Sequence, residues 1–265
     1  MIESVQNPKV KYLVKLRRAR VRRREGLFIV EGHREIKVGL QAEADLEEAF
    51  FCPALFPGGE QEACLAALKE RGVSLVEMTQ APFEKVSIRE NPDGLLVLAR
   101  TWEVDLTGLK LGSTPLVLVG DGLEKPGNLG AILRSAAAMS VDAVLCVDPN
   151  LDLFNPNVVR ASQGQLFRVP AWVGDKEGAL SFLRRRELRI CATSAKAKTS
   201  MWEANLKGAT AIVIGSEAHG LDSFWLDAAD DWLTIPMPGE VDSLNLSVAA
   251  GCLLAEVNRQ RRSTG

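Results

Sequence analysis

Histidine and cysteine are scarce in this chain, and their scarcity argues against several kinds of site. Only His33 and His219 occur among 265 residues, so we expect no zinc centre, no other metal site and no multi-histidine active site. The five cysteines are scattered, odd in number and without a CxxC pair. We therefore expect buried free thiols and a reducing, cytoplasmic setting rather than a disulfide framework.

Long apolar runs and phosphate-binding glycine motifs are also missing. No apolar run approaches the roughly 20 residues that span a bilayer, so no membrane partner is expected. The basic N-terminus is not followed by an apolar h-region, so we expect no secretory signal. The patterns GxGxxG and GxxxxGK[ST] are absent, which argues against a Rossmann dinucleotide site and against a P-loop.

Charge is distributed unevenly, although the net charge is only −2. Residues 1–24, here called the basic arm, carry nine Lys and Arg against one Glu, so the rest of the chain is acidic. Clustered charge of one sign repels itself, which favours a polyanion partner such as RNA over the alternative of a solvated helix face. The arm residues that we expect to bind RNA are Lys9, Lys11, Arg17, Arg18, Arg22, Arg23 and Arg24.

The first hundred residues predict a small α/β domain. Asn7 as N-cap, Pro8 in the first turn and Gly26 after the last turn delimit a basic helix over residues 9–24. Glycine, proline and the lack of any period place a linker over residues 101–115. The elements expected after the first helix are a strand over 27–30, a helix over 31–40, a strand over 49–52, a helix over 61–72 and strands over 73–78 and 94–100.

The remaining residues, 116–265, predict a second α/β domain. Its strands are nearly continuous apolar runs separated by helices, which favours a parallel sheet covered on both faces. The expected strands are 116–120, 143–147, 188–193, 211–215 and 230–236, with residues 167–172 extended, and the expected helices are 128–139, 155–164, 176–186 and 244–261.

Two strand ends carry candidate site residues, because open α/β sheets bind ligands beyond the carboxyl ends of their strands. Arg134 is the only charge in a helix of small and apolar residues. It could form a salt bridge to a neighbour, or it could bind an anion or substrate. Glu217 lies between two glycines in "GSEAHGL". It could act in a site, or it could accept hydrogen bonds from the loop.

The third candidate is the entrance to the last helix, "IPMPGEVDSLNLSVAAG". Its prolines and glycine stiffen and turn the loop. Ser243 or Asn245 could cap the helix, but three polar residues at 243, 245 and 247 exceed what one cap needs.

Together these segments resemble the three motifs of the SpoU/TrmH family of RNA 2'-O-ribose methyltransferases. "NLGAILR", "VIGSEAHGL" and the entrance segment stand in the family's order and spacing, and "NPNVVRASQGQLFRVP" between them is also similar. The resemblance covers about residues 116–257, and the first thirty residues are similar to the RNA substrate-binding domain of many members. It implies a trefoil knot, a homodimer and bound S-adenosylmethionine.

The resemblance also implies roles for single residues. Gly215, Ile235, Met237, Leu244 and Ser247 would bind S-adenosylmethionine. Arg134, Asn128, Glu217, Ser243 and Asn245 would form the catalytic site. The family's motif arginine is usually given the role of base, but a guanidinium stays protonated in proteins, so Arg134 is better suited to hold a phosphate, and its role in proton transfer stays open.

The function expected from this resemblance is methylation of a ribose 2'-hydroxyl, with ribosomal RNA favoured as substrate by the N-terminal domain. Three alternatives stay open. They are a transfer-RNA 2'-O-methyltransferase, a non-catalytic RNA-binding protein that uses the basic arm, and a nucleotide-dependent α/β enzyme, which the missing phosphate loops disfavour.

Overall fold

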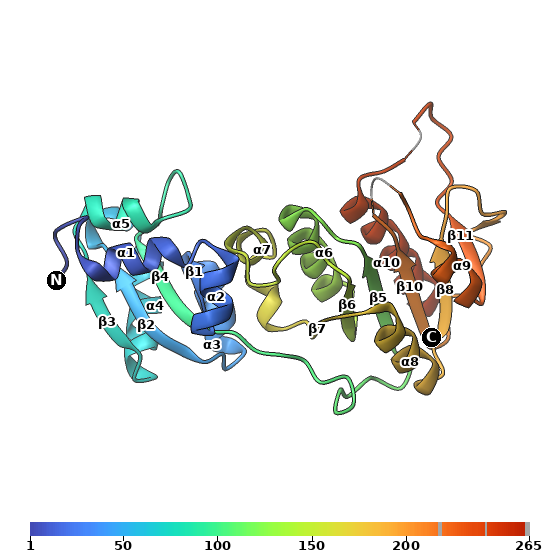
Figure 1. Ribbon diagram of the computed structural model, residues 1–265, viewed down its shortest axis with the longest axis horizontal. Helices are drawn as coiled ribbons and strands as arrows, with labels where there is room; N and C mark the ends of the chain where they lie inside the picture. Colours follow the sequence, from blue (N-terminus) through green and yellow to red (C-terminus); the bar gives the residue numbers. More distant parts are fainter. Residues whose placement is uncertain (217–218, 242, 263–265) are drawn as a thin grey trace. The chain divides into compact units, whose positions relative to one another are not determined.

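The structure is a computed structural model, and it describes residues 1–216, 219–241 and 243–262. The chain forms two compact units. The N-terminal unit comprises Met1–Trp102 and Asp152–Arg168, and the C-terminal unit comprises Glu103–Leu151 and Val169–Gly265. Figure 1 traces both along the chain. No helix in the described ranges is both long and apolar enough to cross a membrane.

The N-terminal unit is built on a four-stranded sheet with strand order β1-β4-β2-β3. Strand β4 pairs antiparallel with β1 and β2, whereas β2 and β3 are parallel. Its core packs α1 and α5 against strand residues such as Phe50 and Leu96. The elements are α1 (Pro8–Lys15), α2 (Ala19–Glu25), β1 (Leu27–Glu31), α3 (His33–Gln41), β2 (Leu46–Phe51), η1 (Pro53–Leu55), α4 (Glu60–Glu70), β3 (Ser74–Glu77), α5 (Gln80–Val86), β4 (Leu95–Arg100), α7 (Pro156–Ala161) and η2 (Gln165–Phe167).

The basic arm forms two helices, so the prediction of one continuous helix over 9–24 was wrong. Its ends were predicted correctly: the Asn7 side chain accepts a hydrogen bond from the Lys9 N–H, and Gly26 has a φ of +65°. The break lies at residues 16–18. Arg22 donates to the carbonyl oxygens of Leu16 and Arg17, both at 2.8 Å. A side chain from the second helix thus satisfies carbonyls that the first helix leaves open.

Residues 152–168 fold with the N-terminal unit, although they follow the linker in sequence. Phe154 packs on Phe28 and Trp102, with ring centroids 4.8 and 4.9 Å apart, and Phe167 lies 5.7 Å from Trp102. The compact units therefore differ from the predicted contiguous segments 1–100, 101–115 and 116–265. The connection between β6 and β7, two strands of the C-terminal sheet, is thus part of the N-terminal unit.

The C-terminal unit contains a seven-stranded sheet, and every pairing in it is parallel, as predicted. The strand order is β7-β6-β5-β10-β8-β11-β9. Its elements are β5 (Leu116–Asp121), α6 (Pro126–Ala138), β6 (Ala143–Val147), β7 (Ala171–Gly174), α8 (Lys176–Arg185), β8 (Arg189–Thr193), β9 (Thr199–Ser200), β10 (Thr210–Ile214), α9 (Ser223–Ala228), β11 (Asp231–Thr234) and α10 (Leu246–Arg262).

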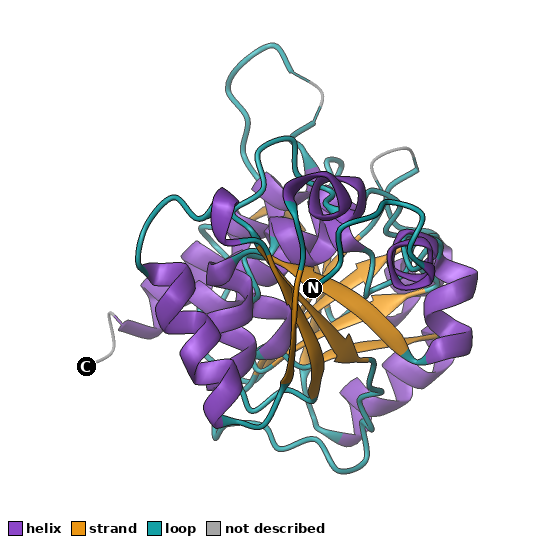
Figure 2. Cartoon of the chain, turned by 90° about the vertical axis from the view of Figure 1, so that its left-hand side faces the viewer, coloured by secondary structure: helices purple, strands orange, loops and turns teal. Residues whose placement is uncertain are grey.

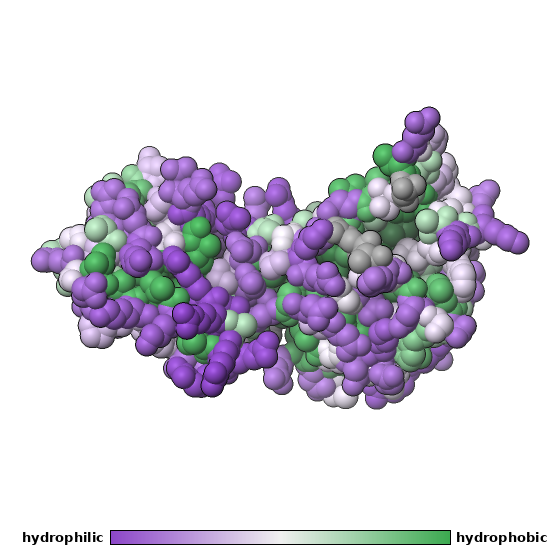
Figure 3. Space-filling view, turned by 45° about the horizontal axis from the view of Figure 1, so that its top comes forward, coloured by the Kyte–Doolittle hydropathy of each residue, from purple (hydrophilic) through white to green (hydrophobic). Residues whose placement is uncertain are grey.

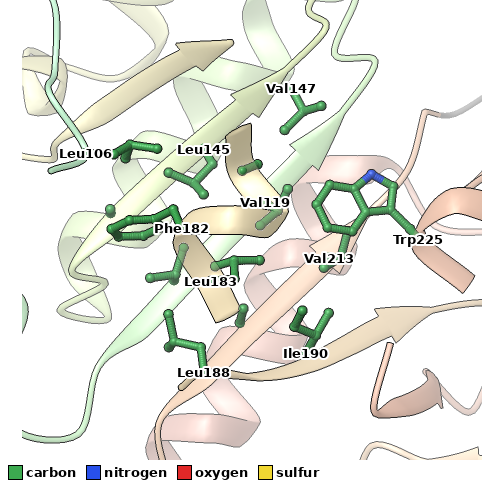
Figure 4. Close-up of a cluster of buried hydrophobic side chains, with 14 residues drawn as sticks. Leu106, Val119, Leu145, Val147, Phe182, Leu183, Leu188, Ile190, Val213 and Trp225 are labelled. Atoms are coloured by element: carbon green, nitrogen blue, oxygen red, sulfur yellow. The ribbon is translucent and has the colours of Figure 1, made fainter. Parts of the chain in front are cut away.

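Helices cover this sheet because its strands are apolar on both faces. Figure 2 shows the helices and strands of the chain from the side of the N-terminal unit. One core contains Phe182 and Leu183 of α8 with Val119 and Leu145 of the sheet, as Figure 4 shows. Helices α6 and α10 pack against each other and against strands β6 and β10. This arrangement sets the start of α10 beside α6, where two of the predicted motifs lie.

Candidate functional site

A cavity of about 400 Å³ lies at the carboxyl ends of β8, β10 and β11 and the start of α10. In Figure 3, apolar residues gather around a hollow in the C-terminal unit. Open α/β sheets bind ligands at this edge, and the volume suits a small molecule. The cavity is lined by Thr193, Ser194, Ala195, Lys196, Ile214, Gly215, His219, Gly220, Leu221, Leu226, Leu233, Thr234, Ile235, Met237, Ser243, Leu244, Leu246, Ala249 and Leu253.

The entrance segment of α10 supplies one wall of this cavity. Ile235, Met237 and Leu244 line it with apolar side chains, and Ser243 adds a hydroxyl. Ser247 does not line the cavity, although it was predicted to bind the methyl donor. Its N–H and hydroxyl both donate to the Asn245 side chain, at 3.0 and 2.7 Å.

Gly215 follows β10 and lines the cavity, but the structure adds a reason for glycine here. A Cβ at this position would overlap the backbone of Gly220 and Leu221. The loop doubles back on itself, because Ser216 and Gly220 form a bridge and the Gly220 N–H donates to the Ser216 carbonyl at 3.0 Å. Glycine is therefore needed for loop closure, whether or not a ligand approaches. Glu217 lies outside the described residues.

Asn245 joins two of the predicted motifs. Its Oδ1 accepts from the Ser247 N–H, so it caps α10, and its Nδ2 donates to Asn128 Oδ1 at 3.1 Å. Asn128 lies in the first turn of α6, 117 residues earlier in sequence. Of the two residues expected as possible caps, Asn245 is therefore the one that caps α10. Its side chain also links the third motif to the first.

Arg134 lies in α6, two turns beyond Asn128, and its side chain is exposed. Within the described part of the chain it forms no hydrogen bond or salt bridge. An intramolecular salt bridge, one of the two alternatives for this residue, is therefore not present among these residues. The guanidinium is available to a ligand or to another molecule.

A cluster of three charged residues lies at the end of β5. Asp121 is 7% exposed and pairs with Lys176 at 3.4 Å, and Lys176 also pairs with Asp222. Burial raises the pKa of Asp121, and Lys176 opposes that rise. The pairs join β5 to the starts of α8 and α9. Their role is to fix the strand end that precedes the first motif.

Several lining residues were not predicted from the sequence. Thr193 is the last residue of β8, Ser194 and Lys196 follow that strand, and His219 follows β10. The available signal was a polar stretch, "TSAK", directly after an apolar strand. It carries neither proline nor glycine, so it did not stand out.

Several cations of the basic arm form contacts within the protein. Arg22 is 2% exposed and pairs with Asp152 at 2.6 Å, which corrects the expectation that it contacts RNA. Arg17 donates to three carbonyls at the end of α5, and Lys9 pairs with Glu48 at 2.5 Å. Arg24 pairs with its neighbour Glu25. Lys11, Arg18 and Arg23 are exposed.

The fold matches that of solved RNA methyltransferases. The crystal structure of an RNA 2'-O ribose methyltransferase superposes with a TM-score of 0.88 at 40% identity, covering 98% of this chain and 99% of that one. The SpoU methyltransferase AviRb from Streptomyces viridochromogenes, solved with S-adenosylmethionine, has the same fold, with a TM-score of 0.88 at 23% identity over 97% of this chain and all of that one.

Sequence comparison defines the family. The SpoU rRNA Methylase family matches residues 115–255, and the MRM3-like substrate binding domain matches residues 7–97. The chain is 35% identical to the 23S rRNA (guanosine-2'-O-)-methyltransferase RlmB of Xylella fastidiosa over 79% of this chain and 89% of that protein. It is 27% identical to 23S rRNA (guanosine(2553)-2'-O)-methyltransferase RlmP of Bacillus subtilis, over 96% and 97%.

These matches identify an S-adenosylmethionine-dependent methyltransferase. The chain belongs to the SpoU rRNA methylase family.

Proposed function

We propose that this methyltransferase transfers a methyl group to a ribose 2'-hydroxyl of ribosomal RNA. The observation that carries the proposal is the apolar cavity at the carboxyl ends of β8, β10 and β11, with the Asn128–Asn245 hydrogen bond tying α6 to its entrance segment. When bound, S-adenosylmethionine supplies a sulfonium-activated methyl group.

The residues of the cavity suit that donor. Ile235, Met237 and Leu244 offer apolar contact to an adenine ring, and the backbone on either side of Gly215 offers polar groups beside them. Ser243 and Thr193 place hydroxyls in the same lining. In this proposal these residues orient the donor, and Ser247 acts through Asn245 rather than by direct contact.

Arg134 would bind the RNA substrate. A planar guanidinium holds a phosphate through paired hydrogen bonds, and its charge favours alkoxide character at a nearby 2'-hydroxyl. Alignment and charge stabilisation are each worth orders of magnitude in rate. Glu217 and Arg134 are the two candidates for the group that removes the hydroxyl proton.

The variants Arg134→Ala and Arg134→Lys test this role. We expect Arg134→Ala to lower single-turnover methylation by at least about 100-fold while donor affinity and melting temperature stay unchanged. Arg134→Lys keeps the charge but not the fork, so it should remain strongly impaired. Near-normal turnover with a lowered melting temperature would show that Arg134 is structural.

Ribosomal RNA is favoured over transfer RNA by how much of the chain each group of relatives covers. Relatives named for 23S rRNA cover as little as 61% and as much as 96% of this chain. Structures concerned with tRNA, one on methylation of C/U34 and one of a TrmH/SpoU enzyme from A. aeolicus, cover 57% and 60%. Mapping ribose methylation in total RNA with and without the gene identifies the substrate. A lost methylation in tRNA alone would refute the proposal.

The trefoil knot, the homodimer and the cytoplasmic location also belong to this proposal. The five cysteines are unpaired, which suits a reducing compartment. Sedimentation tests the dimer. Pulling the chain by its ends tests the knot, because a tightened knot leaves the unfolded chain shorter than its full extended length.

A further inference from the structure

A groove in the N-terminal unit lies along helix α3. It consists of two cavities, of about 780 and about 400 Å³, and His33 and Arg34 line both. The larger cavity also takes residues from the loop after α5 and from α7, and the smaller one takes residues from α4. We call the two together the α3 groove. Both volumes lie within the range of roughly 300–1,000 Å³ that is usual for ligand pockets.

Three cations line the α3 groove without a partner. Arg34, Lys37 and Arg160 are exposed, and none of them forms a hydrogen bond through its side chain or a salt bridge with another residue that the structure describes. Arg34 and Lys37 lie one turn apart on α3, and Arg160 lies in the last turn of α7. An unpaired cation on a groove wall is free to bind an anion.

Most acidic residues of the groove are already paired. Asp93 and Glu60 hold the two ring nitrogens of His33, at 2.7 and 2.9 Å, and Glu35 pairs with Arg89 at 2.8 Å. Among the lining residues, this leaves Glu90 as the acid for which the structure gives no partner. Four cations and four carboxylates line the groove, so its total charge is close to zero, and the three unpaired cations are the groups left to meet the anionic part of a ligand.

The floor of the groove is a buried ion pair that is not fully satisfied. Glu35 is 4% exposed, and its Oε2 has no hydrogen-bond partner; the same holds for the buried Nε of Arg89. These are two of the four such side-chain atoms in the described part of the chain. Gly32 has a φ of +107°, which favours glycine, and a Cβ there would meet the ends of both side chains. A buried polar atom without a partner destabilises the fold, so its presence calls for an explanation, and a role in a functional site is one such explanation.

A nucleic-acid strand suits this surface better than a small anion. The cations are spread over two joined cavities, and Asn91 and Gln163 add side-chain amides to the larger one. Amides can pair with base edges, whereas guanidinium and ammonium groups hold phosphates. In the basic arm, by contrast, Arg17 and Arg22 are already engaged within the protein.

We propose that the α3 groove binds a single-stranded segment of the RNA substrate, with Arg34, Arg160 and Lys37 on the phosphates and Asn91 and Gln163 at the bases. This proposal rests on the proposed function, because it names where the substrate-binding unit holds its RNA. It adds a contact surface that lies outside the basic arm and outside the donor cavity.

The test compares two double variants of the full chain. Arg34→Ala with Arg160→Ala removes two groove cations. Lys69→Ala with Lys85→Ala removes the same charge from exposed positions of the same unit that line neither cavity. Binding to an unmodified transcript of the cognate 23S rRNA is measured over a range of salt concentrations. The groove variant should lose at least about tenfold in affinity, and its salt slope should fall by about 1.4, since each single-strand contact contributes about 0.7.

The controls separate the possible failures. Donor binding, measured by calorimetry, should be unchanged in both variants, and melting curves verify the fold. If the groove variant is unfolded, the milder Arg34→Gln replaces it. Equal RNA affinity and equal salt slopes in the two double variants would overturn the proposal that the α3 groove binds RNA. If the wild-type protein binds this RNA but does not methylate it, the proposed function is overturned. The comparison of RNA affinities would still show whether the groove binds RNA.

Discussion

Arg22 and Arg23 are neighbours in sequence with opposite environments, so they form a matched pair. Both were expected to bind RNA from the charge pattern. Arg22 is buried, with Nε 2.8 Å from Asp152 and Nη1 2.8 Å from the carbonyls of Leu16 and Arg17. Arg23 is exposed. Replacing each by alanine removes the same charge and tests which one the fold needs.

The magnitude follows from what Arg22→Ala leaves behind. Removing one partner of a buried ion pair costs about 3–5 kcal/mol, because the other charge loses its compensation. The Asp152 side chain is 12% exposed and can regain some water, so we expect the lower end, about 3 kcal/mol. In a unit of this size that lowers the melting temperature by on the order of 10 °C. Arg23→Ala should stay within about 0.5 kcal/mol of wild type.

Denaturant unfolding gives the free energies, and hydrogen exchange of β1 and α7 locates the loss in the N-terminal unit. Asp152→Asn serves as a second probe. It keeps an acceptor for Arg22 but not the charge, so it should cost less than Arg22→Ala. The reasoning is refuted if Arg22→Ala is as stable as Arg23→Ala and loses as much RNA affinity.

Three further changes probe the C-terminal unit. Gly215→Ala should weaken donor binding at least about tenfold by calorimetry, because its Cβ overlaps the backbone of its own loop, whereas Gly127→Ala, which meets no neighbouring atom, should not. Asn245→Asp keeps the acceptor that caps α10 but loses the donor to Asn128, so turnover should fall while stability is kept; equal loss of both would reduce Asn245 to a cap. Burial raises the pKa of Asp121, so the stability it contributes below its unfolded pKa of about 3.9 is lost as pH rises through the folded pKa. Asp121→Asn should therefore reduce the fall in unfolding free energy between about pH 4 and pH 7, and an unchanged fall would refute the assignment.

The sequence predicts the strands of the parallel sheet well because they are continuous apolar runs. The run over 143–147 matches β6 residue for residue. Short elements were missed, among them α5, α9 and the two-residue strand β9. Elements this short are held by tertiary contacts rather than by their own period. The same holds for the break in the basic arm, which depends on the buried Arg22.

The candidate site was predictable where its loops carry unusual residues. The entrance segment was found through its prolines, glycine and polar residues, and four of the five predicted donor-binding residues line the cavity. The wall formed by Thr193, Ser194 and Lys196 was missed. It reaches the cavity because β8 lies between β10 and β11 in the sheet, and strand order is not encoded in any local pattern.

Residues 152–168 show most clearly why a contiguous boundary is hard to read from sequence. They lie inside the match to the methylase family, yet they fold with the N-terminal unit. Helical period and apolar spacing are the same whether α7 covers its own sheet or another unit. The contacts of residues 152–168 determine which unit they fold with. Phe154 and Phe167 pack on the ring of Trp102, and Asp152 pairs with the buried Arg22. A fragment that begins at residue 115 keeps every residue of the donor cavity but loses these partners. Its apolar side chains would then lie in water, and so donor binding by this protein is a property to measure on the whole chain.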